Sequence, residues 1–233
     1  MITSGHPDKV VFVVGTDTEV GKTWIARQLL QAWKSLGLKV SARKLAQSYA
    51  KGAWPTDADV LATASDELPE EVCLPKYWYP VEMAPPMAAI VLGMTPPTLA
   101  ELVLSIGWPA GVDIGIVEAA GGVRSPQASD GDCIDLARLI DPQVIILVGH
   151  AGLGTINAIR MSHEALTGIK RADGQDIPIY AVLNHFEISS ELHHYNLEWL
   201  RDKYSIEACT GIVDDVVKLA TRLADYFGLL STG

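Results

Sequence analysis

Short apolar runs along the chain alternate with stretches whose apolar positions follow a helical period. The run VVFVV at residues 10–14 is apolar at every position, which is typical of a strand buried on both faces of a parallel sheet. Residues 22–36 instead carry apolar side chains at helical spacing, which predicts a helix. The same two patterns predict further strands at 38–44, 113–119, 144–149 and 179–185, a weaker strand at 206–213, and helices at 154–170, 190–203 and 214–226.

The segment 50–97 interrupts this alternation, because it is rich in Pro, Ala and Trp. We predict that it forms mostly loops, with a helix around 58–65. The alternation on either side of it predicts a doubly wound α/β fold, with a mostly parallel sheet flanked by helices. No repeat, low-complexity tract or linker divides the chain, so residues 1–233 are predicted to form one domain.

Composition narrows the environment and the partners of the protein. The formal net charge is −10, which argues against a nucleic-acid partner and against an anionic membrane surface. No apolar run approaches the roughly 18 residues that a membrane-spanning helix needs, and the amino-terminal residues lack a cleavable-signal pattern. The three cysteines form no C-x-x-C pair, as expected in a reducing compartment. We therefore expect a cytoplasmic protein.

The stretch GTDTEVGKT at residues 15–23 stands between the first predicted strand and the first predicted helix. That context predicts a phosphate-binding loop and a fold of the P-loop NTPase type, because backbone N–H groups at a helix start converge on an anion. Lys22 would lie near the β- and γ-phosphates, and the Thr23 hydroxyl would contact Mg²⁺. The alternative is a glycine turn that only begins a helix. The candidate nucleotide contacts are Gly15, Thr16, Asp17, Thr18, Glu19, Val20, Gly21, Lys22 and Thr23.

The loop departs from the strict G-x-x-x-x-G-K-[ST] pattern, since its first glycine stands at position 15 and Thr16 follows. This departure is typical of the P-loop proteins with deviant loops. The switch-type ATPases of that group carry a second lysine five places before the GK lysine. The chain has Asp17 at that place.

With these residues the chain resembles the dethiobiotin synthetases, whose loop reads G-T-D-T-x-V-G-K-T. Five further stretches are similar to motifs of that family, in the family's order, and the resemblance covers about residues 10 to 215. They are KLAQS with Lys44 and Ser48, DADVL with Asp57, VEAAGG with Glu118, Gly121 and Gly122, LGTIN with Gly154 and Asn157, and VLNH with Asn184.

The resemblance implies an activity and a set of roles. The family uses ATP to join CO₂ or bicarbonate to the amines of 7,8-diaminopelargonic acid, through a phosphorylated carbamate, and releases dethiobiotin. It implies a homodimer acting on a small-molecule diamine with Mg²⁺ as cofactor. The implied catalytic residues are Lys22, Lys44 and Thr18, the metal ligands are Thr23, Asp57 and Glu118, the adenine contact is Asn184, and the substrate contacts are Ser48, Gly121, Gly122, Gly154 and Asn157. At Gly154 and Asn157 a helix start would receive the substrate carboxylate at the dimer interface.

Several of these residues have a plain structural alternative. Asp57 could be only the N-cap of the helix over 58–65, and Asp59 is a rival for the metal. Lys44 could be a solvated strand end. Asn157 could cap a helix and Asn184 could belong to a turn.

The chain also departs from the family pattern, chiefly near the expected diamine and base pockets. Two alternative functions stay open. One is a related P-loop ligase that acts on a different amine, and the other is a non-catalytic or switch-type ATPase. A preference for a nucleotide other than ATP also stays open. The departures are Leu45, Tyr49, Met87, Ala119, Ala158 and Asp214.

Overall fold

A computed structural model describes residue 7 and residues 9–230 of the chain. Its main feature is a six-stranded sheet in the order β10-β9-β8-β1-β5-β2, and every neighbouring pair in it is parallel. The predicted α/β fold with a mostly parallel sheet is therefore confirmed. The strands of this sheet are β1 (Lys9–Gly15), β2 (Val40–Lys44), β5 (Ile114–Gly122), β8 (Val144–His150), β9 (Ile179–Asn184) and β10 (Ala208–Thr210).

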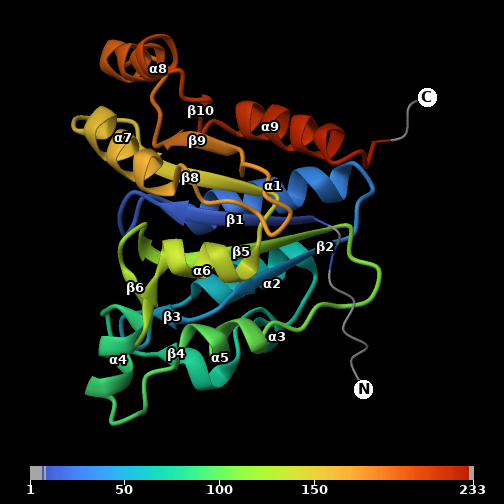
Figure 1. Cartoon of the computed structure of the whole chain (residues 1–233), viewed down its shortest axis with the longest axis vertical. Coiled ribbons are helices and arrows are strands. Elements are labelled where there is room, and N and C mark those ends of the chain that lie inside the picture. The colour runs from blue at the N-terminus through green and yellow to red at the C-terminus, as the bar shows by residue number, and fades with distance from the viewer. Residues whose placement is uncertain (1–6, 8, 231–233) are drawn as a thin grey trace.

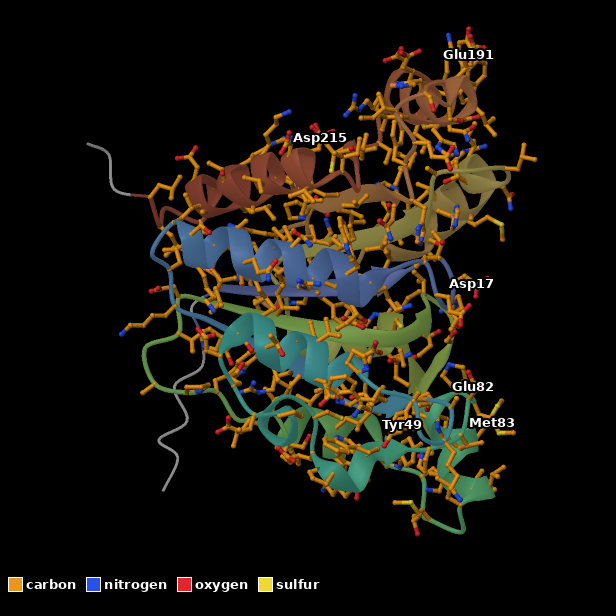
Figure 2. All side chains as sticks on the ribbon, turned by 180° about the vertical axis from the view of Figure 1, so that it is seen from behind. Asp17, Tyr49, Glu82, Met83, Glu191 and Asp215 are labelled. Atoms are coloured by element: carbon orange, nitrogen blue, oxygen red, sulfur yellow. The ribbon has the colours of Figure 1, made fainter. Side chains whose placement is uncertain are left out.

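Helices flank both faces of the sheet. In Figure 1, α6 and α7 lie in front of it, whereas α1, α2 and α9 lie behind it and face the viewer in Figure 2. The helices are α1 (Lys22–Ser35), α2 (Asp57–Ser65), α3 (Pro69–Val72), α4 (Pro85–Val91), α5 (Leu99–Leu104), α6 (Cys133–Ile140), α7 (Thr155–Leu166), α8 (Glu191–Tyr204) and α9 (Val213–Tyr226), with a 3₁₀ turn, η1, at Pro75–Tyr77.

The sequence pattern explains why β1 lies at the centre. Its residues 10–14 are at most 1% exposed, because β1 pairs with β5 on one side and β8 on the other and has helices over both faces. Helix α1 turns Ile25, Leu29 and Trp33 inward, and these side chains are fully buried. Burying apolar surface contributes about 25 cal/mol per Å², so this helix is held firmly at the end of β1.

The parallel arrangement of the strands places the predicted site residues at one edge of the sheet. Because all six strands run the same way, their carboxyl ends and the loops that follow them lie together. Strand order also reverses at β1, whose neighbours β5 and β8 lead to opposite sides of the sheet. Such a reversal opens a crevice at the carboxyl edge, where ligands of doubly wound sheets bind.

The prediction for the segment 50–97 was wrong in part. Helix α2 is present, but the segment also forms α3, η1, α4 and β4 (Trp78–Tyr79), which pairs in parallel with β3 (Gln47–Ser48). These elements are too short for a period to be recognised, and they are fixed by packing around buried Tyr77 and Tyr79.

Other differences are smaller. Helices α5 and α6 and the antiparallel pair β6 (Pro126–Ala128) and β7 (Gly131–Asp132) were not predicted. The predicted strand at 206–213 shrinks to β10, since helix α9 already begins at Val213. No helix in the described part of the chain is both long and apolar enough to cross a membrane.

Candidate functional site

The loop at 15–23 links β1 to α1 and holds an open ring of backbone. Gly21 has φ +89° at the start of α1, a conformation that favours glycine. A side chain at Gly15 would meet the carbonyl oxygen of Asp17 at 2.8 Å, so this glycine is required by close approach. The Lys22 ammonium donates to that same carbonyl at 3.0 Å. The loop therefore has the shape of a phosphate cradle, with its lysine folded across the opening.

A buried ion-pair cluster lies beside the loop. Lys44 ends β2, and its ammonium nitrogen is 2.5 Å from Glu118 Oε1 and 2.8 Å from Asp57 Oδ2. The lysine side chain is 3% exposed and that of Glu118 is fully buried, whereas that of Asp57 is 42% exposed. Lys44 is therefore not a solvated strand end. It connects strand β2, the neighbouring strand β5 and the start of α2.

Thr23 joins this cluster to the phosphate loop. Its hydroxyl oxygen lies 2.8 Å from Asp57 Oδ1 and 2.8 Å from Glu118 Oε1. The other carboxylate oxygen of Glu118, Oε2, is buried and has no hydrogen-bond partner. A buried carboxylate oxygen without a partner is costly, so this atom points to a ligand that brings positive charge.

The charges in the cluster shift one another's pKa. Burial by itself lowers the pKa of Lys44, but the Asp57 and Glu118 carboxylates outweigh burial and raise it. Burial raises the pKa of Glu118, and the nearby Lys44 offsets this only in part. Burial also acts to raise the pKa of Asp57, yet its contact with Lys44 leaves that pKa lowered. Burial and the neighbouring Lys44 lower the pKa of Lys22.

Asp57 and Asp59 were both candidates for the metal ligand, and the structure gives them different contacts. Thr56 is the N-cap of α2, and Asp59 closes a capping box by accepting from the Thr56 backbone N–H at 2.8 Å. Asp57, the first residue of the helix, turns instead toward Thr23 and Lys44. Asp57 is therefore not the N-cap, and Asp59 is occupied by the backbone of its own helix.

The loop and the cluster open into one cleft of about 700 Å³. Its lining brings together ten of the predicted site residues from six segments of the chain. They are Thr18, Glu19, Gly21, Lys22, Thr23, Lys44, Ser48, Asp57, Glu118 and Gly121. The Ser48 hydroxyl is buried there without a hydrogen-bond partner.

Eight predicted residues do not line this cleft: Gly15, Thr16, Asp17 and Val20 of the loop, and Gly122, Gly154, Asn157 and Asn184. Gly122 packs against the loop, since a side chain there would meet the Thr16 carbonyl oxygen at 2.9 Å. Asn184 is buried, and its amide donates to the Val20 carbonyl at 3.0 Å. Gly154 precedes α7 and Asn157 lies in its first turn, both exposed. Asn184 thus braces the phosphate loop, and the α7 pair faces away from the cleft of its own chain.

The sequence reasoning missed six lining residues: Glu82, Met83, Ala84, Pro85, Ala120 and Ser125. Ser125 accepts a hydrogen bond from the Gly122 backbone N–H at 2.9 Å, and its nearness to the glycine pair was an available signal. Glu82 and Met83 gave no signal, because they lie far in sequence from any predicted strand end. Figure 2 shows them at the same edge of the molecule as Asp17 of the phosphate loop.

With this geometry established, similarity to known proteins decides the family. Residues 9–185 match a family model described as an AAA domain. Over 170 residues the chain is 38% identical to the ATP-dependent dethiobiotin synthetase BioD of Chromohalobacter salexigens, covering 70% of this chain and 69% of that protein. Over 167 residues it is 39% identical to the protein of that name from Pseudomonas aeruginosa, covering 67% of this chain and 71% of that protein. The chain belongs to the dethiobiotin synthetase family.

Solved structures support the fold of this dethiobiotin synthetase family member. A putative plasmid partition protein from Borrelia burgdorferi aligns with a TM-score of 0.57 at 11% identity, over 94% of this chain and 99% of that one. The septum site-determining protein MinD from Pyrococcus horikoshii aligns with a TM-score of 0.54 at 15% identity, over 97% of this chain and 99% of that one. At such low identity these likenesses concern the P-loop fold alone.

The departures from the dethiobiotin synthetase pattern occupy different surroundings. Leu45 and Ala119 are buried in the core beside the cluster. Met87 is 55% exposed on α4, and Asp214 lies in the first turn of α9. None of these four lines the cleft, and neither do Tyr49 and Ala158, although the Lys44 ammonium donates to the Ala119 carbonyl at 3.3 Å.

A second cavity is larger, at about 840 Å³, but it lies at the β10 edge between α8 and α9 and contains no residue of the phosphate loop. Its cationic side chains are already paired. Arg201 donates to the Ala208 carbonyl, Lys218 to Asp215 and Arg222 to Glu207. The smaller cleft, which holds the loop and an unpartnered carboxylate oxygen, is therefore the candidate active site.

Proposed function

We propose that the protein is an ATP-dependent dethiobiotin synthetase, a cyclo-ligase that closes a vicinal diamine and CO₂ into a cyclic urea. The observation that carries the proposal is the meeting of Lys44, Asp57 and Glu118 beside Lys22 and Thr23 in one cleft. The switch-type ATPases of the deviant-loop group carry their second lysine within the phosphate loop, where this chain has Asp17, whereas Lys44 ends strand β2. Membership of the dethiobiotin synthetase family supports the same activity.

The donor set fits a magnesium ion. Thr23, Asp57 and Glu118 offer one hydroxyl and two carboxylates, which are the hard oxygen ligands that Mg²⁺ takes, and Glu118 Oε2 lacks a partner. The described residues contain no group of three or more His, Cys, Asp or Glu side chains that could hold a metal ion, so phosphate oxygens and water would complete the shell. Bound there with ATP, Mg²⁺ would neutralise charge on the phosphates.

The reaction needs cations more than a covalent catalyst. One amine of 7,8-diaminopelargonic acid adds to CO₂, which forms an N–C bond and releases a proton. The carbamate oxygen attacks the γ-phosphorus, and the bond from that phosphorus to the leaving oxygen of ADP breaks. The second amine attacks the carbamate carbon, and phosphate leaves. Lys22 and Lys44 stabilise the charge that moves between carbamate and phosphate, and Thr18 and Ser48 orient those groups.

A second copy of the chain would complete the substrate site. Gly154 and Asn157 stand at the start of α7, where the Thr155 hydroxyl is buried without a partner. This helix start, with its free N–H groups, suits the substrate carboxylate. The exposed Leu153 and Met161, at 90% and 64%, suit an apolar contact nearby. We therefore propose a homodimer in which α7 of one copy faces the cleft of the other. We also propose that the protein works in the cytoplasm, because its cysteines are unpaired and thiols stay reduced there.

The test is ADP release by the purified protein with ATP, Mg²⁺ and bicarbonate, measured with and without 7,8-diaminopelargonic acid. The expected result is ADP release that depends on the diamine and a product with the mass of dethiobiotin. Diamine-independent hydrolysis would instead favour a switch-type ATPase. Nucleotide binding without a response to this diamine, but with a response to another amine, would favour the related ligase with a different substrate.

A further inference from the structure

Glu82 stands in the cleft as a carboxylate without a partner. It lies in the connection between β4 and α4, its side chain is exposed, and it lines the cleft next to Met83. Among the described residues no other group forms a hydrogen bond or ion pair with it. Figure 2 shows Glu82 and Met83 together at the carboxyl edge of the sheet, on the side of Tyr49.

Two of the other three acids of the cleft are already bound to side chains of the protein. Four acidic residues line it: Glu19, Asp57, Glu82 and Glu118. Asp57 and Glu118 are bound to Lys44 and Thr23 and form the proposed metal site. Glu19 belongs to the phosphate loop, where it takes φ +60°. Glu82 is therefore the lining acid that belongs neither to the phosphate loop nor to the proposed metal site, and within residues 9–230 it has no hydrogen-bond or ion-pair partner.

A diamine requires such a group. Near neutral pH an alkyl diamine enters with at least one nitrogen as ammonium, since a primary amine has a pKa of about 10. Lys22 and Lys44 line the same cleft and repel that charge, and the repulsion grows as the cleft loses water. A free carboxylate elsewhere in the lining offsets this repulsion and fixes which end of the diamine points toward the lysines.

We propose that the Glu82 carboxylate binds the ammonium group of the substrate nitrogen that is not carbamated, and so orients the diamine across the cleft. The inference rests on the proposed function, because it assigns a contact to that reaction's substrate. Met83, which is 44% exposed at the same wall, packs against the adjoining methylene groups. The contact holds the substrate complex, and that nitrogen must lose its proton before the ring closes.

The test compares Glu82→Gln with wild type in steady-state assays and in binding to protein loaded with a non-hydrolysable ATP analogue. Losing a charge-assisted hydrogen bond is expected to raise the KM and Kd for the diamine by roughly 10- to 100-fold, with the KM for ATP within about twofold. Glu82→Asp should recover part of the loss. The matched control is Glu70→Gln, an exposed acid on α3 that does not line the cleft, which should change neither constant.

A substrate analogue sharpens the test. An analogue with only the amine that becomes carbamated should bind wild type and Glu82→Gln about equally, because it lacks the ammonium that Glu82 contacts. If Glu82→Gln weakens the diamine and this monoamine to the same degree, or leaves the diamine KM unchanged, the inference is overturned. Equal unfolding midpoints for the two proteins establish that the variant is folded.

Failure of the proposed function gives a different pattern. If wild type neither binds nor converts 7,8-diaminopelargonic acid, the proposed function falls. The binding comparison is then made with a series of short vicinal diamines. Weaker binding of these by Glu82→Gln would keep the assignment of Glu82 as an ammonium contact, whereas no binding by wild type would overturn that as well.

Discussion

Lys44 and Glu118 face each other directly across two neighbouring parallel strands. They are register partners in the β2–β5 pair, and their charged atoms lie 2.5 Å apart with both side chains buried. Strand pairing thus places a lysine and a glutamate at the carboxyl edge of the sheet, beside the phosphate loop. The contact that joins these two strands is therefore also part of the proposed active site.

Replacing Lys44 should therefore affect both stability and turnover. Lys44→Met leaves the Glu118 carboxylate buried without its ammonium, and breaking a buried pair in this way costs about 3–5 kcal/mol. Turnover should fall by at least about 100-fold, as for the loss of a group that stabilises transferred charge, while nucleotide binding remains. Denaturant unfolding, ADP release and nucleotide titration measure the three effects.

The matched variant for this prediction is the double replacement Lys44→Met with Glu118→Gln. It should be less destabilised than the sum of the two single variants, because neither ion is then left alone. Additive losses would contradict the buried pair as the cause. Equal loss of nucleotide binding in Lys44→Met and Lys22→Met would contradict the division of roles between the lysines.

Nucleotide binding should weaken at alkaline pH, earlier than for an ordinary lysine. Burial and the neighbouring Lys44 lower the pKa of Lys22 below 10.5 in the nucleotide-free protein. Lys22 is charged below its lowered pKa and loses the proton as pH rises through it, so the Kd for ATP should rise there. Isothermal titration from pH 7 to about 10 measures this. Lys22→Arg keeps its charge throughout this range, so its Kd for ATP should not rise at alkaline pH. A rise that persists in this variant would assign the effect to another group.

The two aspartates of α2 should behave differently. Asp57→Asn removes a proposed metal ligand and should weaken Mn²⁺ binding in the presence of nucleotide by roughly 10-fold or more. Asp59→Asn weakens the capping box and should lower the free energy of unfolding by about 1 kcal/mol, with metal affinity unchanged. Electron paramagnetic resonance of Mn²⁺ and thermal unfolding report the two effects. Equal metal loss in both variants would reject Asp57 as the ligand.

The phosphate loop should not tolerate a side chain at Gly21. A Cβ there would lie 2.0 Å from Asn184 Nδ2, and the backbone has φ +89°. Gly21→Ala should therefore lose nucleotide binding by about 100-fold or more, since the Asn184 side chain that donates to the Val20 carbonyl must shift and the loop backbone is strained at this φ. Gly37→Ala is the control, because Gly37 has φ +81° with open space around it. That variant should lose only about 1–2 kcal/mol of stability to backbone strain and keep its nucleotide affinity.

The fold and part of the site follow from local sequence pattern. The buried strand 10–14, the loop 15–23 and the helix that follows could be predicted because residues close in the chain determine all three. Lys44, Glu118 and Asn184 could be placed at one edge because they end predicted parallel strands. Helix α6 was missed because it spans only eight residues, fewer than the roughly 11 over which a helical period is recognised, and its N-cap Asp132 could not be told from an ordinary loop acid.

The tertiary structure alone decided which polar groups meet. Asp57 and Asp59 are two residues apart and chemically alike, and only the position of α2 against β2 and the phosphate loop turns one to Lys44 and the other to its own helix start. Glu82 reaches the cleft because β3 pairs with β4 and carries the following segment to the carboxyl edge. Sequence by itself determined the sheet and the phosphate loop, since residues close together in the chain set the period of apolar positions and the local backbone geometry. The position of Glu82 in the cleft lining depends on packing between distant segments, which no local pattern encodes.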